Sequence, residues 1–77
     1  MIVVTGSNGF IGSNLIFQLN KRGIQDILAV DDLSKKDQIS NLSHCEIEEL
    51  IDINDFYPNL NNNLLKEKKI KTIFHQG

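Results

Sequence analysis

The sequence predicts an α/β fold: part of a doubly wound parallel sheet, with about four strands in the order β-α-β-β-α-β. Short apolar runs without alternation indicate strands buried on both faces, and stretches with helical spacing separate most of them. Strands joined through helices pair in parallel with right-handed crossovers. Hydrophobic residues make up 40% and charged residues 23% of the 77 residues, which is ordinary for a soluble globular domain.

The first half of the chain alternates clearly between strand and helix patterns. Residues 2–5 form a β-branched strand, and a glycine-rich break separates it from a helical pattern that stops at Gly23. Residues 27–30 form the second buried strand, and the polar residues 34–40 indicate a loop. The helix is expected to pack through one apolar face consisting of Phe10, Ile11, Leu15, Ile16 and Leu19.

The second half has weaker signals. A third strand is expected within residues 41–47, because acids alternate with apolar residues there as on an edge strand. Asn54 is expected to cap a helix that contains Phe56, Leu60 and Leu64, with Pro58 tolerated in its first turn. Residues 70–74 form a fourth strand beside the first. Its bare outer edge indicates that the chain stops halfway through a larger sheet.

Charge and composition exclude several functions. The net charge is −2, so neither a nucleic acid nor an anionic membrane is an expected partner. The one basic cluster, residues 66–71, suits the C-terminal end of a helix. No apolar run is long enough for a bilayer, and residues 1–6 predict a strand rather than a signal peptide. The chain has a single cysteine, Cys45, which is expected to be a small buried apolar residue. A lone cysteine fits a reducing compartment, so the predicted location is cytoplasmic.

The glycine-rich break has the pattern of a phosphate-binding loop. Its spacing is G-x-x-G-x-x-G between a buried strand and a helix: Gly6 would permit the tight turn, Gly9 the approach of a pyrophosphate, and Gly12 close packing of the helix. Ser7 and Asn8 would add side-chain hydrogen bonds. The helix start, at Phe10 and Ile11, would direct N–H groups and a positive dipole toward the phosphates. The alternative is a purely structural glycine turn.

An acid stands where a dinucleotide-binding Rossmann domain binds the adenosine ribose. Asp31 ends the second strand, about 20 residues after the loop, and would accept hydrogen bonds from the ribose hydroxyls. Asp32 would repel the 2′-phosphate of NADP, whereas Lys35 and Lys36 would attract it unless they are only solvated. The cofactor is therefore NADP or NAD, and the charges leave the choice open.

Two further segments lie near the expected ligand. Asp52 and Ile53 would flank the adenine, although Asp52 is equally well explained as an acid at a helix N-terminus. His75 has no partner carboxylate in the sequence and is interpreted as structural rather than as a general base. The backbone of Gln76 and Gly77 would pass near the pyrophosphate or the nicotinamide ribose. No catalytic or metal-ligating residues are assigned.

The segment VTGSNGFIGSNL resembles the extended short-chain dehydrogenase/reductase group, which uses TGxxGxxG. Later pieces are similar to the ADP-L-glycero-D-manno-heptose 6-epimerases: Gly23-Ile24, Asp26-Ile27-Leu28, Val30-Asp31-Asp32-Leu33, Asn41-Leu42 and Phe74-His75-Gln76-Gly77. Three positions depart from those epimerases, which usually have Asn at 32 and Lys at 38 and 53. This chain has Asp32, Gln38 and Ile53 there.

The resemblance implies an isomerase of lipopolysaccharide core heptose metabolism, with tightly held NADP, that inverts C6 of an ADP-heptose. Residues 1–77 would be its N-terminal NAD(P)-binding half, and the nucleotide-sugar pocket, the Tyr-x-x-x-Lys pair and the homo-oligomer would belong to the full-length protein. Tyr57, the only tyrosine, has Asn61 four residues later, so this chain alone is expected to be inactive. The alternatives are a UDP-sugar 4-epimerase, a 4,6-dehydratase, a reductase, or a non-catalytic dinucleotide-binding module.

Overall fold

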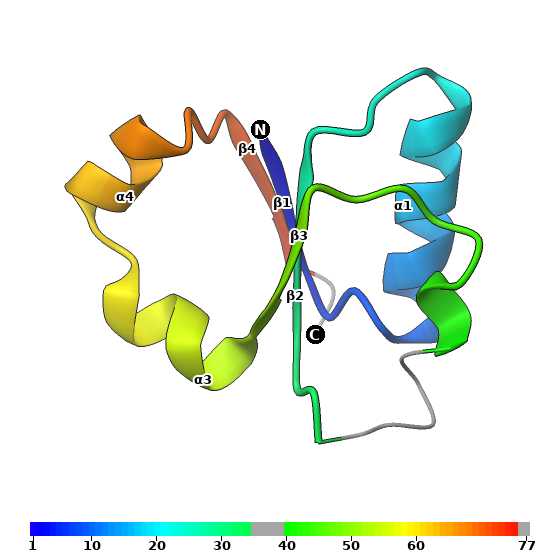
Figure 1. The fold of residues 1–77 in the computed structure, drawn as a ribbon, viewed down its shortest axis with the longest axis horizontal. Coiled ribbons are helices and arrows are strands. Elements are labelled where there is room, and N and C mark those ends of the chain that lie inside the picture. The colour runs from blue at the N-terminus through cyan, green and yellow to red at the C-terminus, as the bar shows by residue number, and fades with distance from the viewer. Residues whose placement is uncertain (35–39, 76–77) are drawn as a thin grey trace.

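The computed structural model describes residues 1–34 and 40–75. Four parallel strands form one sheet in the order β3-β2-β1-β4. The strands are β1 (Ile2–Thr5), β2 (Ile27–Asp31), β3 (Glu49–Asp52) and β4 (Thr72–His75). The helices are α1 (Phe10–Lys21), α3 (Ile53–Phe56) and α4 (Asn62–Glu67), with 3-10 turns η1 (Ser40–Leu42) and η2 (Tyr57–Asn59). Figure 1 shows the sheet edge-on, with α1 and η1 on one face and α3 and α4 on the other. The predicted partial Rossmann fold is confirmed.

The two central strands are buried on both faces, as their unbroken apolar runs predict. Successive side chains of β1 and β2 enter opposite faces of the sheet, and two core clusters result. On the α1 face the buried residues are Val4, Ile16, Ile27, Ala29 and Leu42. On the α3 face they are Val3, Leu28, Val30 and Phe56. The largest of them, Phe56, is 2% exposed and covers the sheet from α3.

Helix α1 ends as predicted but packs through a narrower face. Gly23 follows its C-cap with a φ of +82°, a conformation that glycine adopts without strain. The prediction that Phe10 and Ile11 join the core face is wrong, because their side chains are 79% and 68% exposed. The first turn of α1 instead packs through Gly12 and Ser13, which are buried.

The third strand lies later in the chain than predicted. Residues 41–47 contain the last two residues of η1 and an irregular segment, and β3 begins only at Glu49. The alternating pattern around Cys45 reflects burial without strand pairing: Cys45 and Ile47 pack against the α1-side core. The pairing with β2 determines the strand, since Glu48 N–H donates to the Ile27 carbonyl and Leu28 is in register with Glu49.

The predicted helix after Asn54 is divided into three short elements. Asp52, not Asn54, caps α3, because its carboxylate accepts from the Asn54 N–H at 2.8 Å. Pro58 lies in η2, which separates α3 from α4. Asn61 then caps α4 by accepting from the Leu64 N–H at 2.9 Å. Leu60 and Leu64 still pack against the α3-side core, as the spacing predicts.

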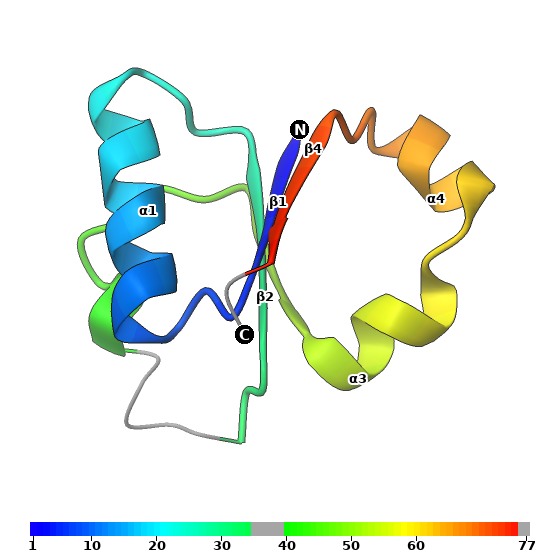
Figure 2. The same cartoon turned by 180° about the vertical axis from the view of Figure 1, so that it is seen from behind.

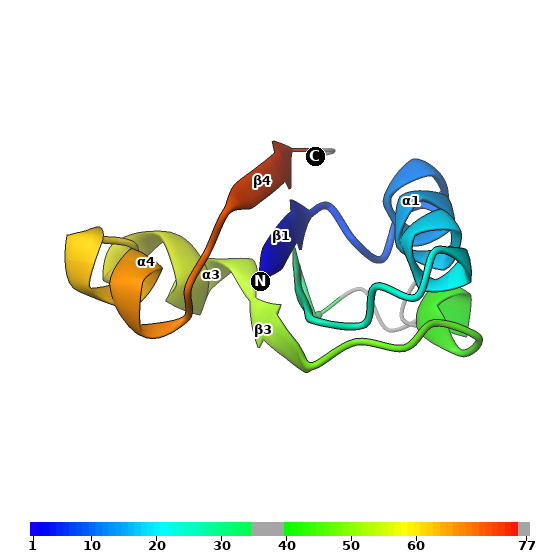
Figure 3. The ribbon, with the colours of Figure 1, turned by 90° about the horizontal axis from the view of Figure 1, so that it is seen from above.

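Strand β4 lies beside β1, as predicted, with its start shifted from residue 70 to Thr72. Figure 2, from behind, shows the two strands side by side, and Figure 3 shows β4 and β3 at opposite ends of the stack of strands. Lys68 pairs with Glu49 at 3.1 Å, so one lysine of the basic cluster connects the end of α4 with β3.

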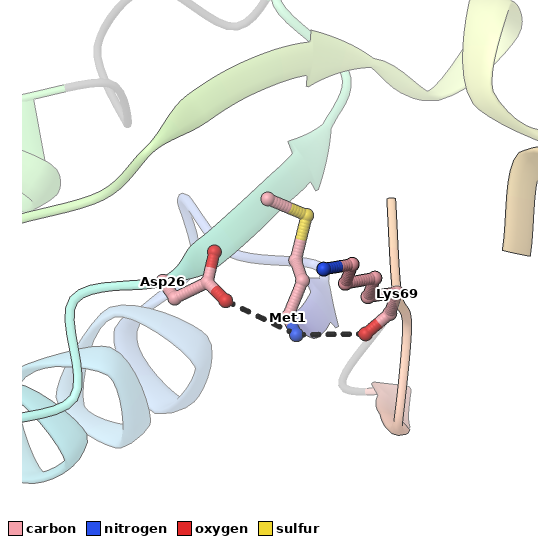
Figure 4. Close-up of polar contacts among 3 residues, drawn as sticks. All are labelled: Met1, Asp26 and Lys69. Carbon is pink, nitrogen blue, oxygen red and sulfur yellow. Dashed lines mark hydrogen bonds and ion pairs between the residues drawn. The ribbon is translucent and has the colours of Figure 1, made fainter. Parts of the chain in front are cut away.

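The N-terminal ammonium connects the starts of three strands. It lies 3.1 Å from the Asp26 carboxylate, just before β2, and donates to the Lys69 carbonyl at 2.9 Å, between α4 and β4 (Figure 4). Lys69 has a φ of +52°, and the Met1 carbonyl accepts from the Lys71 N–H at 3.0 Å. Polar contacts at Met1 therefore join the amino ends of β1, β2 and β4.

Candidate functional site

The carboxyl edge of the sheet, at the lower side of Figure 1, brings the predicted site residues together. The loop from β1 to α1 leaves this edge, and the last residues of β2 and β3, Asp31 and Asp52, lie next to each other in register. Ligands of open parallel sheets bind outside this edge. Helix α1 also begins at this edge, and the Asp31 carboxylate bonds to the Asn8 N–H just before it.

The turn after β1 depends on Gly6. Its φ of +69° is a left-handed conformation, as a tight strand-to-helix turn requires, which confirms the predicted role of this glycine in the turn. Backbone bonds close the turn: the Ser7 N–H donates to the Val30 carbonyl at 3.2 Å, and the Gly9 N–H donates to the Gly6 carbonyl at 3.3 Å. The loop is thus fastened to the neighbouring strand.

The other two glycines, Gly12 and Gly9, differ in whether the fold itself requires a residue without a Cβ at that position. A Cβ on Gly12 would lie 2.1 Å from the Gly6 carbonyl oxygen, so only glycine lets α1 approach the turn this closely. This confirms the packing role predicted for Gly12. A Cβ on Gly9 would lie 3.5 Å from the same oxygen, an ordinary contact. The folded chain therefore has room for a Cβ at Gly9. The close approach of a pyrophosphate to Gly9 stays a prediction.

The backbone of Asn8 is held by two side chains, one at the end of β2 and one in η1. Asp31 Oδ2 accepts from the Asn8 N–H at 2.8 Å, and the Asn41 amide donates to the Asn8 carbonyl at 2.8 Å. Asp31 Oδ1 also accepts from the Asp32 N–H at 2.6 Å. The acid expected at the ribose therefore contacts the glycine loop directly.

The hydrogen bonds of the loop decide which donors remain for an anion. The N–H groups of Ser7, Asn8 and Gly9 all have acceptors within the chain. In the part of the chain that the structure describes, no group accepts from the N–H groups of Phe10, Ile11 or Gly12, which precede the first bond of α1. No side chain caps α1 and no acid stands in its first turn. The free donors thus lie in the first turn of the helix.

The side chains of Ser7 and Asn8 do not face outward. Both residues are 0% exposed, and Ser7 Oγ donates to Asn8 Oδ1 at 3.2 Å. Both side chains are thus buried within the turn, and their predicted hydrogen bonds to a phosphate stay a prediction. Asn8 Nδ2 is a buried donor without an acceptor among residues 1–34 and 40–75. These residues support the loop from inside.

The acids around the edge have local partners. Asp32 Oδ1 accepts from Ser34 N–H at 3.0 Å and from Ser34 Oγ at 2.6 Å. Asp52 caps α3 and accepts from the Leu33 N–H at 3.3 Å. Its interpretation as an acid at a helix N-terminus is therefore observed, whereas its contact with the adenine stays a prediction. Ile53, half-buried, packs against the α3-side core.

His75 has hydroxyl partners that the sequence analysis missed. Its Nδ1 lies 2.7 Å from Thr5 Oγ1 and 3.0 Å from the Tyr57 hydroxyl. These contacts connect the ends of β1 and β4 with η2, which supports the structural interpretation of this histidine. Sequence analysis also missed the role of Asn41, and the only signal was the Asn41-Leu42 pair. Lys35, Lys36, Gln38, Gln76 and Gly77 lie outside the described residues.

A parallel sheet, a helix starting at a glycine turn and an acid ending the second strand together define a Rossmann-type dinucleotide-binding domain. Residues 2–77 match the NAD dependent epimerase/dehydratase family, and the chain belongs to it. This family is enzymatic and uses NAD(P), and the match supports the resemblance to the extended short-chain dehydrogenase/reductase group. None of the described helices is long and apolar enough to cross a membrane.

Proposed function

We propose that this chain binds the adenosine diphosphate half of a dinucleotide for a nucleotide-sugar epimerase or dehydratase. The observation that carries the proposal is the Asp31–Asn8 hydrogen bond of 2.8 Å, which joins the ribose-binding acid to the loop before α1. An uncapped helix N-terminus beside an acid suits a ligand with a pyrophosphate next to a ribose.

Each part of the ligand has a partner in this arrangement. The pyrophosphate would accept from the first-turn N–H groups of α1, and Asp31 would accept from the ribose hydroxyls through its remaining lone pairs. Ile53 and Asp52 would flank the adenine. We propose that Lys35, Gln76 and Gly77 contribute from outside the described residues. The cofactor, when bound, supplies reversible hydride transfer, while this chain binds and orients it.

Taken alone, the two acids at the end of β2 favour NAD over NADP, whereas Lys35, Lys36 and the heptose-epimerase resemblance favour NADP. Asp31 and Asp32 are both held in place by backbone N–H groups, and a 2′-phosphate beside them would be repelled. Titrating the chain with each cofactor and following thermal unfolding tests this preference. A ligand at about 100 times its dissociation constant stabilises the folded chain by about 2.7 kcal/mol, which shifts the unfolding temperature measurably.

The outcomes of this titration separate the proposals. A larger shift with NAD supports both dinucleotide binding and the role of the two acids. A larger shift with NADP retains the binding site, contradicts the preference for NAD and agrees with the heptose-epimerase resemblance. A folded chain that shifts with neither cofactor contradicts dinucleotide binding by this chain.

The particular reaction that we propose is C6 epimerisation of ADP-glycero-manno-heptose, on the strength of the motif resemblance. The catalytic and sugar-binding groups would lie outside residues 1–77. The test incubates the full-length protein with the two C6 epimers of the ADP-heptose and follows their interconversion by NMR. Conversion of a UDP-sugar instead would assign a 4-epimerase, 4,6-dehydratase or reductase. Binding without any turnover would favour a non-catalytic module.

A further inference from the structure

Asn41 lies at the centre of η1, far from the glycine loop in sequence but next to it in the fold. Leu42, its neighbour, is 8% exposed and anchors η1 in the core beneath α1. Asn41 itself is exposed, yet its Nδ2 lies 2.8 Å from the Asn8 carbonyl oxygen. This hydrogen bond joins η1 to the glycine loop.

The bond orients the peptide that leads into α1. The carbonyl of the 8–9 peptide accepts from Asn41, and the N–H of the same peptide donates to the Gly6 carbonyl at 3.3 Å. Gly9, which follows, is the N-cap of α1 and accepts the first helical bond, from the Ser13 N–H at 2.9 Å. The direction of this peptide therefore sets where the free N–H groups of the first turn point.

We propose that Asn41 is a positioning residue of the dinucleotide site, acting through the Asn8 carbonyl on the phosphate-binding turn of α1. The inference rests on the proposed function. Asp31 ends β2 and Asn41 lies in η1, so two side chains from different elements hold the backbone of Asn8, one at its N–H and one at its carbonyl. Asn41 does not contact the ligand in this proposal, and its effect is on the placement of the donors.

The chain offers a matched control at the other end of α1. Asn20 also donates its amide to backbone carbonyls, to Ile24 at 2.9 Å and to Glu46 at 2.8 Å. The first bond holds the turn between α1 and β2, the second fastens α1 to the segment before β3, and neither involves the glycine loop. Substitution of Asn20 thus reports the loss of an ordinary structural amide.

The experiment compares the intact chain with Asn41→Ala and Asn20→Ala. The unfolding temperature and the dissociation constants for ADP and for AMP are measured for each. A general loss of stability weakens both ligands equally, so the ratio of the two constants is insensitive to it. The ratio instead reports how well the second phosphate is held by the first turn of α1.

We expect Asn41→Ala to reduce the preference for ADP over AMP by about tenfold, the effect of losing about one typical hydrogen bond. Asn20→Ala should lower the unfolding temperature and leave the ratio unchanged. An unchanged ratio in Asn41→Ala, or an equal change in Asn20→Ala, overturns the inference and leaves the proposed function standing. If the folded intact chain binds neither ADP nor NAD(P), the proposed function fails and this inference fails with it.

Discussion

Asp31 Oδ2 accepts a 2.8 Å hydrogen bond from the backbone N–H of Asn8, so the acid that ends β2 holds the loop that follows β1. The same carboxylate accepts from the Asp32 N–H through Oδ1. Two acceptor oxygens are therefore in use before any ligand arrives. The loop conformation and the predicted ribose contact depend on one side chain.

Asp31→Asn should destabilise the loop, because an amide has one acceptor oxygen for the two N–H donors. We expect a loss of about 1–3 kcal/mol in the free energy of unfolding, together with weaker dinucleotide binding. Asp55→Asn, at an exposed acid in α3, is the matched control. Chemical denaturation measures both variants, and equal stability of the two would contradict the double acceptor role of Asp31.

Gly12→Ala and Gly9→Ala should differ strongly in their effect on the free energy of unfolding. The Cβ on Gly12 meets the Gly6 carbonyl oxygen at 2.1 Å, so we expect a loss of about 3 kcal/mol or more as α1 is displaced. The Cβ on Gly9 makes an ordinary contact at 3.5 Å, so the stability should change by less than about 1 kcal/mol.

Cofactor binding separates the two glycines further. If a pyrophosphate passes over Gly9, then Gly9→Ala should reduce the affinity for NAD(P) by about tenfold or more while the chain stays folded. Calorimetric titration measures the affinity, and thermal unfolding measures the stability. A folded Gly9→Ala variant with unchanged affinity would show that the ligand does not approach this residue.

Asp26→Asn should weaken the contact of the N-terminal ammonium. The Asp26 side chain is 65% exposed, so the expected loss of stability is about 0.2–1 kcal/mol. Screening by about 1 M salt should reduce the difference between the variant and the intact chain. Thermal unfolding at low and high salt tests this, and a difference that does not change with salt would contradict an ionic contribution.

Ionisation of the Cys45 thiol should make the free energy of unfolding depend on pH in the alkaline range. Burial raises the pKa of its thiol above the ordinary value of 9.0, and Sγ lies 3.6 Å from the Ser13 carbonyl oxygen. A folded-state pKa above the unfolded value contributes stability that is present below the unfolded pKa. That contribution is lost as the pH rises through the folded pKa.

Cys45→Ala removes this titration and about 1 kcal/mol of packing. The stability advantage of the intact chain over Cys45→Ala should be constant near pH 7 and decrease above about pH 9. Denaturation curves from pH 7 to 10 provide the measurement. The folded chain should also react more slowly with iodoacetamide than the unfolded chain. An advantage that grows with pH would contradict the direction of the shift.

Local sequence was sufficient for the central strands, for the α1 termini and for the glycine turn. Uninterrupted apolar runs have one stable location, between two layers, and a left-handed turn in contact with a helix requires Gly6 and Gly12. These features depend on neighbouring residues, so they could be predicted without the fold. Asp31 could be singled out because it ends the second strand about 20 residues after the glycine loop.

Register and long-range partners could not be predicted in this way. The alternation around Cys45 fits an edge strand, but hydrogen bonding to β2 places β3 at Glu49–Asp52. Phe10 and Ile11 fit the apolar helical face, but the first turn packs through Gly12 and Ser13 and leaves them exposed. Burial and pairing depend on what lies opposite, which a periodic pattern does not specify.

By itself, the sequence determined that this chain builds a parallel α/β sheet with a glycine turn after its first strand and an acid at the end of its second. Only the tertiary structure decided which donors in that loop remain free and which side chains hold it. Asn41 follows Asn8 by 33 residues, and Tyr57 precedes His75 by 18, yet each pair is within hydrogen-bonding distance. Such contacts arise when the strands pair and the helices cover the sheet, because packing then brings distant polar groups together.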